Sequence, residues 1–187
     1  DHVCGRVNGT HLGRWQQREH AGGTPVATSQ AILGNDKACE IMNRDDVLKL
    51  WNDAWKEGLW AAPWGKAIDD LTPAQAAWTP AAGRHSIWQI VNHMIFWREH
   101  DLALLKGQKM SGEEKSRRNF EPTPSPANAA AWDATKKRFV QTQQQFASAI
   151  GDSANSVERL QYFLFHDNYH VGQIMYLRSM QGLKPIE

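Results

Sequence analysis

From Asn43 onward, apolar side chains recur at the spacing of a helix, and this pattern constrains the fold more than any other feature. The first such segment covers residues 44–60, where Val47, Trp51 and Trp55 lie on one apolar stripe. Further helices are predicted at residues 86–105, 126–149 and 156–181. Because no segment alternates as a strand does, the sequence predicts an all-α domain, with a four-helix bundle as its default architecture.

Residues that cap helices mark where these segments begin and end. Ser86 and Gln89 form the S-x-x-Q pair of a capping box at the second helix. For the third helix we expect Ser125 as the cap and Pro126 at the first helical position. The other signals are Thr72 and Pro73 before a short helix, Asn155 with Glu158 before the fourth long helix, and Gly182 as its stop.

Two stretches carry no helical signal. The charged stretch from Lys106 to Pro126 is predicted to be a loop. Residues 1–41 contain six of the 14 glycines and both cysteines, Cys4 and Cys39, and their apolar residues follow no period. Their histidines and cysteines match no zinc-binding spacing. We therefore expect an irregular N-terminal extension of unknown role over residues 1–41 and a helical domain over residues 42–187.

The charge balance narrows the class of partner. The net charge is +1 with neutral histidines, and charges of both signs are mixed along the chain. This pattern does not favour a nucleic-acid or a membrane surface. No apolar run approaches the length of a membrane span, and no secretory leader is visible. We expect a cytoplasmic protein without a nucleic-acid or membrane partner.

The segment HDNYHVGQIMYL places His166 and His170 four residues apart on a predicted helix. That spacing puts both imidazoles on one face, one turn apart. Phe163, Ile174 and Leu177 belong to the same stripe, so the pair faces inward. One buried neutral histidine needs only a hydrogen-bond partner, whereas two adjacent ones are harder to satisfy. A divalent cation would resolve this, with a structural or surface pair as the alternative.

A third inward histidine lies on the second long helix. His93 shares a face with Ile90 and Trp97. Three histidines on two helices that must pack together predict a metal site, and three nitrogens with an open fourth position are typical of a catalytic one. His100 lies about 10.5 Å further along the helix axis, so we expect it at the rim in solvent. We expect His85 on a surface loop.

Other residues near these histidines leave alternatives open. Gly172 interrupts a helix, so another helix is expected to approach it closely, or it leaves room beside the metal. Gln173 is either an interfacial polar residue or a hydrogen-bond partner. HDNYH differs by one residue from the zinc-protease motif H-E-x-x-H, but no third ligand follows at protease spacing. We expect Asp167 to be solvated or to lie behind a metal ligand. Most tryptophans are expected in the core, although an aromatic pocket stays open.

Taken together, the segments SIWQIVNHMIFW and HDNYHVGQIMYLRSMQG resemble the DinB-like (YfiT-like) superfamily of metal-dependent enzymes. The resemblance covers about residues 42–182. It implies an antiparallel four-helix bundle with an up-down-down-up course, and often a homodimer. It also implies a divalent metal, usually zinc or nickel, on His93, His166 and His170.

The resemblance implies several activities without choosing among them. Relatives include S-transferases and isomerases that use small thiols, and a metal with an open position can hold a thiol as the nucleophilic thiolate. The same site could activate water for hydrolysis. A non-catalytic metal-binding or stress-related module is the third alternative. No carboxylate is obviously placed as a general base, so no catalytic residue is assigned. An open fourth coordination position beside a pocket would favour an enzyme.

Overall fold

The computed structural model describes residues 42–186, and this part of the chain forms eight helices and no strand. The prediction of an all-α domain is therefore confirmed, while the predicted extension at residues 1–41 lies outside the described residues. No helix in the described part is long and apolar enough to cross a membrane. The long helices are α1 (Arg44–Lys56), α4 (Ile87–Leu105), α6 (Ala129–Gly151) and α8 (Tyr162–Met180). The short helices are α2 (Lys66–Asp69), α3 (Pro73–Ala77), α5 (Gly112–Arg118) and α7 (Val157–Leu160).

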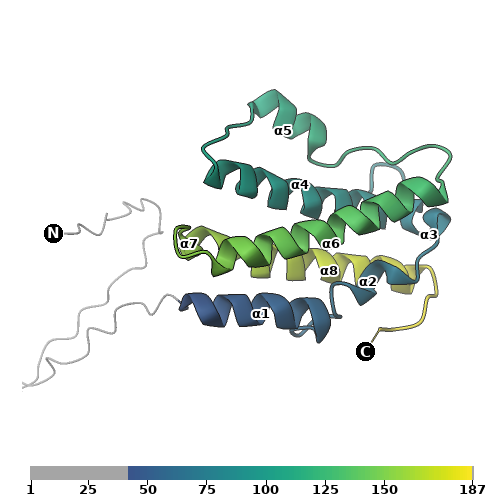
Figure 1. Cartoon of the computed structure of the whole chain (residues 1–187). Helices are drawn as coiled ribbons and strands as arrows, with labels where there is room; N and C mark the ends of the chain where they lie inside the picture. Colours follow the sequence, from purple (N-terminus) through teal and green to yellow (C-terminus); the bar gives the residue numbers. More distant parts are fainter. Residues whose placement is uncertain (1–41, 187) are drawn as a thin grey trace, which may run out of the picture. The chain divides into compact units, whose positions relative to one another are not determined.

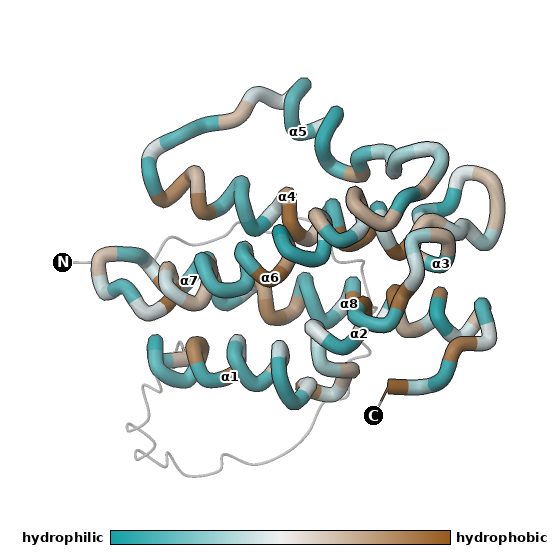
Figure 2. The backbone as a smooth tube through the Cα atoms, turned by 45° about the vertical axis from the view of Figure 1, so that its right-hand side comes forward, coloured by the Kyte–Doolittle hydropathy of each residue, from teal (hydrophilic) through white to brown (hydrophobic). Residues whose placement is uncertain are grey.

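The four long helices enclose a shared apolar core. Helices α1 and α4 each pack against both α6 and α8 (Figure 1). Apolar residues recur along all four helices, whereas α5 is almost entirely hydrophilic (Figure 2) and buries no residue. Helix α4 buries side chains on almost every side, because α3, α6 and α8 all pack against it. Its side chains therefore reach the centre of the domain.

Four fully buried tryptophans fill much of this core. A buried indole N–H needs an acceptor, and each of the four has one. Trp51 and Trp132 donate to main-chain carbonyls of Gln143 and Leu71, at 3.2 and 2.8 Å. The other two donate to side chains: Trp88 to Thr135 at 2.9 Å and Trp64 to Asn168 at 3.0 Å. The expected core role holds for these residues, whereas Trp60 is exposed.

The capping signals at the second long helix and at the short helix are confirmed. The Ser86 hydroxyl accepts from the Gln89 N–H at 3.2 Å, and the Gln89 side chain accepts from the Ser86 N–H at 3.1 Å. Thr72 caps α3 in the same way. Gly182 is also confirmed as a stop, since its φ of +70° lies in the left-handed region that glycine adopts without strain.

Three predicted boundaries were wrong. Helix α1 ends at Lys56 rather than at residue 60, because Gly58 turns the chain with a φ of +83° and its N–H donates to the Asp53 carbonyl at 2.9 Å. Helix α6 does not begin at Pro126 with Ser125 as its cap. Its cap is Asn128, whose side-chain oxygen accepts from the Ala131 N–H at 2.9 Å.

The third wrong boundary concerns the last helix, which is two helices. Helix α7 ends at Leu160 and α8 begins at Tyr162, with Gln161 between them. The expected capping box is not formed, because the Asn155 amide donates to the Ala149 carbonyl at 3.0 Å. A contact with the preceding helix takes the place of the local cap.

The stretch from Lys106 to Pro126 is not a simple loop. It contains α5, which Ser111 caps by accepting from the Glu114 N–H at 3.1 Å. Arg118 then forms an ion pair with Glu99 of α4 at 3.2 Å. Helix α5 is therefore attached to α4. The residues that follow α5 reach His93, one of the two buried histidines of α4.

Candidate metal centre

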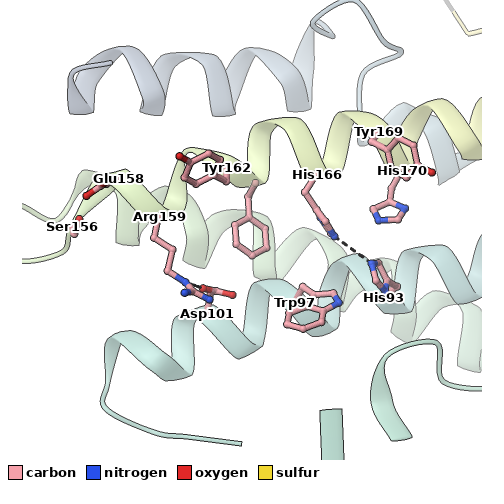
Figure 3. Close-up of a pocket in the computed structure, with 11 residues that line it drawn as sticks. His93, Trp97, Asp101, Ser156, Glu158, Arg159, Tyr162, His166, Tyr169 and His170 are labelled. Carbon is pink, nitrogen blue, oxygen red and sulfur yellow. Dashed lines mark hydrogen bonds and ion pairs between the residues drawn. The ribbon is translucent and has the colours of Figure 1, made fainter. Parts of the chain in front are cut away.

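His93 of α4 and the pair His166 and His170 of α8 lie together. One ring nitrogen from each lies within 4.8 Å of the others. Figure 3 shows the three rings converging from the two helices. The structure thus brings together all three residues that the sequence singled out, and their binding of a metal stays a prediction.

Each of the three rings is held through its Nδ1 atom by an oxygen. His93 Nδ1 lies 3.0 Å from the main-chain carbonyl of Asn119. His166 Nδ1 lies 2.7 Å from the Asp167 carboxylate, and His170 Nδ1 lies 2.8 Å from the side-chain oxygen of Gln173. Such oxygens only accept hydrogen bonds, so each Nδ1 carries the proton. The Nε2 atom of each neutral ring therefore keeps its lone pair.

These lone pairs face one another without a hydrogen between them. The Nε2 atoms of His93 and His166 are 3.2 Å apart (dashed in Figure 3). Two bare nitrogens at this distance repel, and a cation between them removes the repulsion. Tetrahedral zinc with bonds of about 2.0–2.1 Å places its nitrogens roughly 3.3 Å apart. The separation of this pair fits a shared metal ion.

Electrostatics favour the neutral form of His93 and His170, which is the form that a metal needs. Burial, together with the neighbouring His170, lowers the pKa of His93 to about 4. Burial and the neighbouring His166 also lower the pKa of His170. When the pKa of a ring is low, few protons compete with a metal for its nitrogen at neutral pH. These rings can therefore accept an ion at neutral pH.

Behind His166 lies a fully buried ion pair. Asp167 accepts from His166 with one oxygen and from Arg98 with the other, at 2.7 and 2.8 Å. Burial raises the pKa of this carboxyl, but the charge of Arg98 and the bond from His166 outweigh burial and hold the pKa below its usual range. Asp167 lies behind His166, where a residue supporting a ligand was expected, and the solvated alternative is wrong. A carboxylate there fixes the ring and makes it a stronger ligand.

Arg98 is a functional residue that the sequence reasoning missed. Its guanidinium lies 5.0 Å from the ring centroid of Trp51, 5.5 Å from that of Trp64 and 4.5 Å from that of Phe139. These contacts join the ion pair to the aromatic core. An arginine in the apolar segment of α4 was the available signal, because a charge there needs a buried partner.

Residues after α5 hold His93 from the other side. Besides the carbonyl contact, the Asn119 side chain accepts from the Trp97 indole at 2.9 Å. The Phe120 ring stacks on His93 with centroids 4.2 Å apart, and His85 stacks on the outer face of Phe120 at 3.8 Å. The loop prediction concealed Asn119 and Phe120, and no local pattern could have revealed them. His85 lies on an exposed loop, as predicted.

Three further expectations near the site have clear outcomes. His100 is buried rather than exposed at a rim, because α4 is covered along its whole length, and its Nε2 has no partner among the described residues. A Cβ added at Gly172 would meet nothing within 4 Å, so close approach of another helix was wrong. Gln173 is the hydrogen-bond partner of His170 and also donates to the Tyr169 hydroxyl at 3.0 Å.

Two cavities adjoin the histidines. One, of about 780 Å³, contains all three rings in its wall and extends to Asp101 and Arg159. The other, of about 1070 Å³, shares His93 and His170 and is lined also by Gly172. Gly172 therefore leaves space beside the three histidines, which was the second of the two roles expected for it. Within the described residues, no fourth histidine, cysteine or carboxylate joins the group. The donor set thus fits a divalent ion with an open position.

Comparison with known protein families agrees with this geometry. The model of the DinB superfamily matches residues 64–174. The chain belongs to the DinB superfamily. The matched segment contains His93, His166 and His170, so the DinB resemblance and the histidine cluster coincide on the same residues. Searches of the curated proteins and of the solved structures found no match.

Proposed function

We propose that this DinB superfamily protein is a metal-dependent enzyme in which His93, His166 and His170 hold one divalent ion, zinc or nickel. The observation that carries the proposal is the set of three Nδ1 atoms held by oxygens, which leaves the Nε2 atoms to share one ion. A non-catalytic site would close the fourth position with protein. The cavity beside the rings instead supports a catalytic role.

The favoured reaction is transfer of a small thiol to an electrophilic small molecule. A divalent ion in this site would supply a Lewis acid that keeps a thiol deprotonated at neutral pH. The chain itself contributes three oriented rings, the Asp167 carboxylate behind one of them, and cavities on two sides of the centre. Two cavities support two organic reactants, whereas hydrolysis needs one reactant and water. Hydrolysis is the second candidate, because the same ion lowers the pKa of water.

The remaining expectations from the superfamily are proposals as well. Packing of α1 and α4 on both α6 and α8 supports an antiparallel four-helix bundle with an up-down-down-up course. In Figure 1, α1 and α8 run from left to right, and α4 and α6 run from right to left. Exposed large side chains of α8 support a homodimer, among them Phe165, Tyr176 and Met180. Analytical ultracentrifugation would test this state. We also propose a cytoplasmic location.

Metal analysis of the untagged protein is the decisive test of the centre. We expect about one zinc or nickel per chain and its loss in His170→Ala. His85→Ala is the matched control, because His85 adjoins the same centre on an exposed loop but is not a ligand. Full metal content in His170→Ala would disprove the three-histidine site. Thiol-dependent turnover of an electrophile that disappears in the same variant would support transfer, and thiol-independent turnover would support hydrolysis.

A further inference from the structure

The cavity of about 780 Å³ has two chemically different ends. Along α4, His93, Trp97 and Asp101 follow one another at intervals of one turn on the same face. Asp101 therefore lies about 12 Å along the helix axis from His93. Figure 3 shows Asp101 and Arg159 at one end of the cavity, the histidines at the other, and Trp97 between them.

The far end holds an arginine whose orientation is fixed. Arg159 Nε donates to one oxygen of Asp101, and the other oxygen of Asp101 lies 3.3 Å from His100 Nδ1. The Asp101 side chain is only 3% exposed, whereas that of Arg159 is 61% exposed. Both carboxylate oxygens of Asp101 thus contact protein partners. The two terminal nitrogens of Arg159 have no protein partner within residues 42–186, and Arg159 is one of the residues that line the cavity.

The middle of the cavity is apolar. Trp97 lies between the two ends (Figure 3), and Tyr162 and Phe163 also line the cavity. The indole N–H of Trp97 already donates to Asn119 at 2.9 Å, so Trp97 offers the cavity its ring and not a donor. A ligand that bridges the two ends therefore needs an apolar or aromatic body.

Resting on the proposed metal centre, we propose that Arg159 is an anion-binding subsite that selects an elongated reactant with a carboxylate or similar anion at one end. The reactive end, a thiol in the favoured reaction, lies at the histidines, and the body lies against Trp97 and Phe163. The anion binds the free end of the Arg159 guanidinium, which is the side chain best suited to a planar two-oxygen group. Asp101 is a positioning residue, because it touches Arg159 and not the cavity ligand.

Two carboxylates line this end of the cavity and oppose an anion: Asp101, which is paired with Arg159, and Glu158, which provides a sharp control. Glu158 lines the same end of the cavity from α7, and it is exposed, so water screens it. Ser156 supplies a neutral hydroxyl there. Arg159 is therefore the cation of this cavity wall among the described residues.

The test uses the full chain loaded with cobalt(II), whose visible spectrum reports both the metal centre and a thiolate ligand. The probes are mercaptoalkanoic acids of increasing length, from mercaptoacetate to mercaptoundecanoate, and the mercaptoalkanols of equal length. We expect mercaptooctanoate to bind about five- to tenfold more tightly than mercaptooctanol, with no such preference for mercaptoacetate. Arg159→Gln should abolish the preference, and Glu158→Gln should keep or increase it.

The outcomes separate this inference from the proposed function. Unchanged cobalt bands in Arg159→Gln show that the variant is folded with an intact centre. Cobalt bands with equal binding of acid and alcohol at every length, or a preference that survives in Arg159→Gln, would overturn the anion subsite alone. If no cobalt bands form, the metal centre fails and the subsite fails with it.

Discussion

The supports behind His166 and His170 differ although both histidines lie on α8, one turn apart. His166 is held by Asp167, which pairs with Arg98 where both side chains are 0% exposed. His170 is held by Gln173, which in turn contacts the exposed Tyr169. One support is charged and belongs to the core, and the other is neutral and belongs to the surface.

The two supports should therefore affect two different properties of the domain, its folding stability and its metal binding. Changes to the buried support should affect folding, because removing one partner of a buried ion pair leaves an uncompensated charge. Changes to the support of His170 should affect only how firmly the His170 ring is oriented toward a metal.

Arg98→Met should lower the free energy of unfolding by about 3–5 kcal/mol, because it leaves Asp167 charged and unpaired in the core. Urea denaturation of the metal-free protein measures this change. Lys49→Met is the control, since Lys49 pairs with Asp53 at the surface with its side chain 72% exposed. The control should change stability by less than about 1 kcal/mol. Equal effects of the two substitutions would refute the role of the buried pair.

Gln173→Ala should weaken metal binding by about 10- to 100-fold without a measurable change in the stability of the metal-free protein. The physical reason is that His170 loses the acceptor that fixes its proton on Nδ1. Competition with a zinc-binding dye measures the affinity. Gln144→Ala is the control, because Gln144 is exposed on α6. If Gln173→Ala instead destabilised the fold and kept its metal affinity, the contrast between the two supports would be wrong.

A second buried arginine sharpens the comparison, because its carboxylate partner is exposed. Arg178 donates to both oxygens of Asp70 at 2.7 and 2.9 Å, and the Asp70 side chain is 64% exposed. Asp70→Asn leaves the buried Arg178 charge without its carboxylate, but the new amide oxygen can still accept from Arg178 beside solvent, so it should cost about 1–2 kcal/mol at neutral pH, less than Arg98→Met. Arg178 also keeps a bond to the Ala67 carbonyl at 3.2 Å.

The pH dependence of this pair has a defined sign. The hydrogen bond from Arg178 lowers the pKa of Asp70, and partial burial opposes it. The pair thus stabilises the protein above the unfolded carboxyl pKa of about 3.9, and the stabilisation is lost as the pH falls through the lower folded value. The stability difference between wild type and Asp70→Asn should shrink below about pH 4. A difference that grew on acidification would contradict the assignment.

The smallest expected effect is that of Tyr169→Phe. It removes only the hydroxyl that accepts from Gln173, so the amide keeps its bond to His170. Metal affinity should fall by about threefold or less. The same dye competition measures it, and Tyr176→Phe is the control because Tyr176 is exposed on the same helix. A loss as large as that of Gln173→Ala would show that the tyrosine, and not the amide, orients His170.

His93 and His100 show where reasoning from the sequence reaches its limit. Both lie on α4 and both are buried, at 7% and 4% exposure. The helical spacing correctly separated them along the axis, so only His93 joins the other histidines. It wrongly placed His100 in solvent, because the spacing along α4 does not show which parts of the domain cover each position of the helix. The aspartate beside His100 then takes part in the contact with Arg159.

Local spacing predicted the four long helical segments and the candidate ligands. The capping residues Ser86 and Thr72, the one-turn spacing of His166 and His170, and the inward face of His93 all follow from geometry within a few residues. The tertiary structure decided what supports the ligands. Asn119 and Phe120 contact His93 across 26 and 27 residues of sequence, and Arg98 reaches the centre through Asp167, 69 residues away on another helix. Contacts of that kind depend on how helices pack, and packing energies are not encoded in any local period.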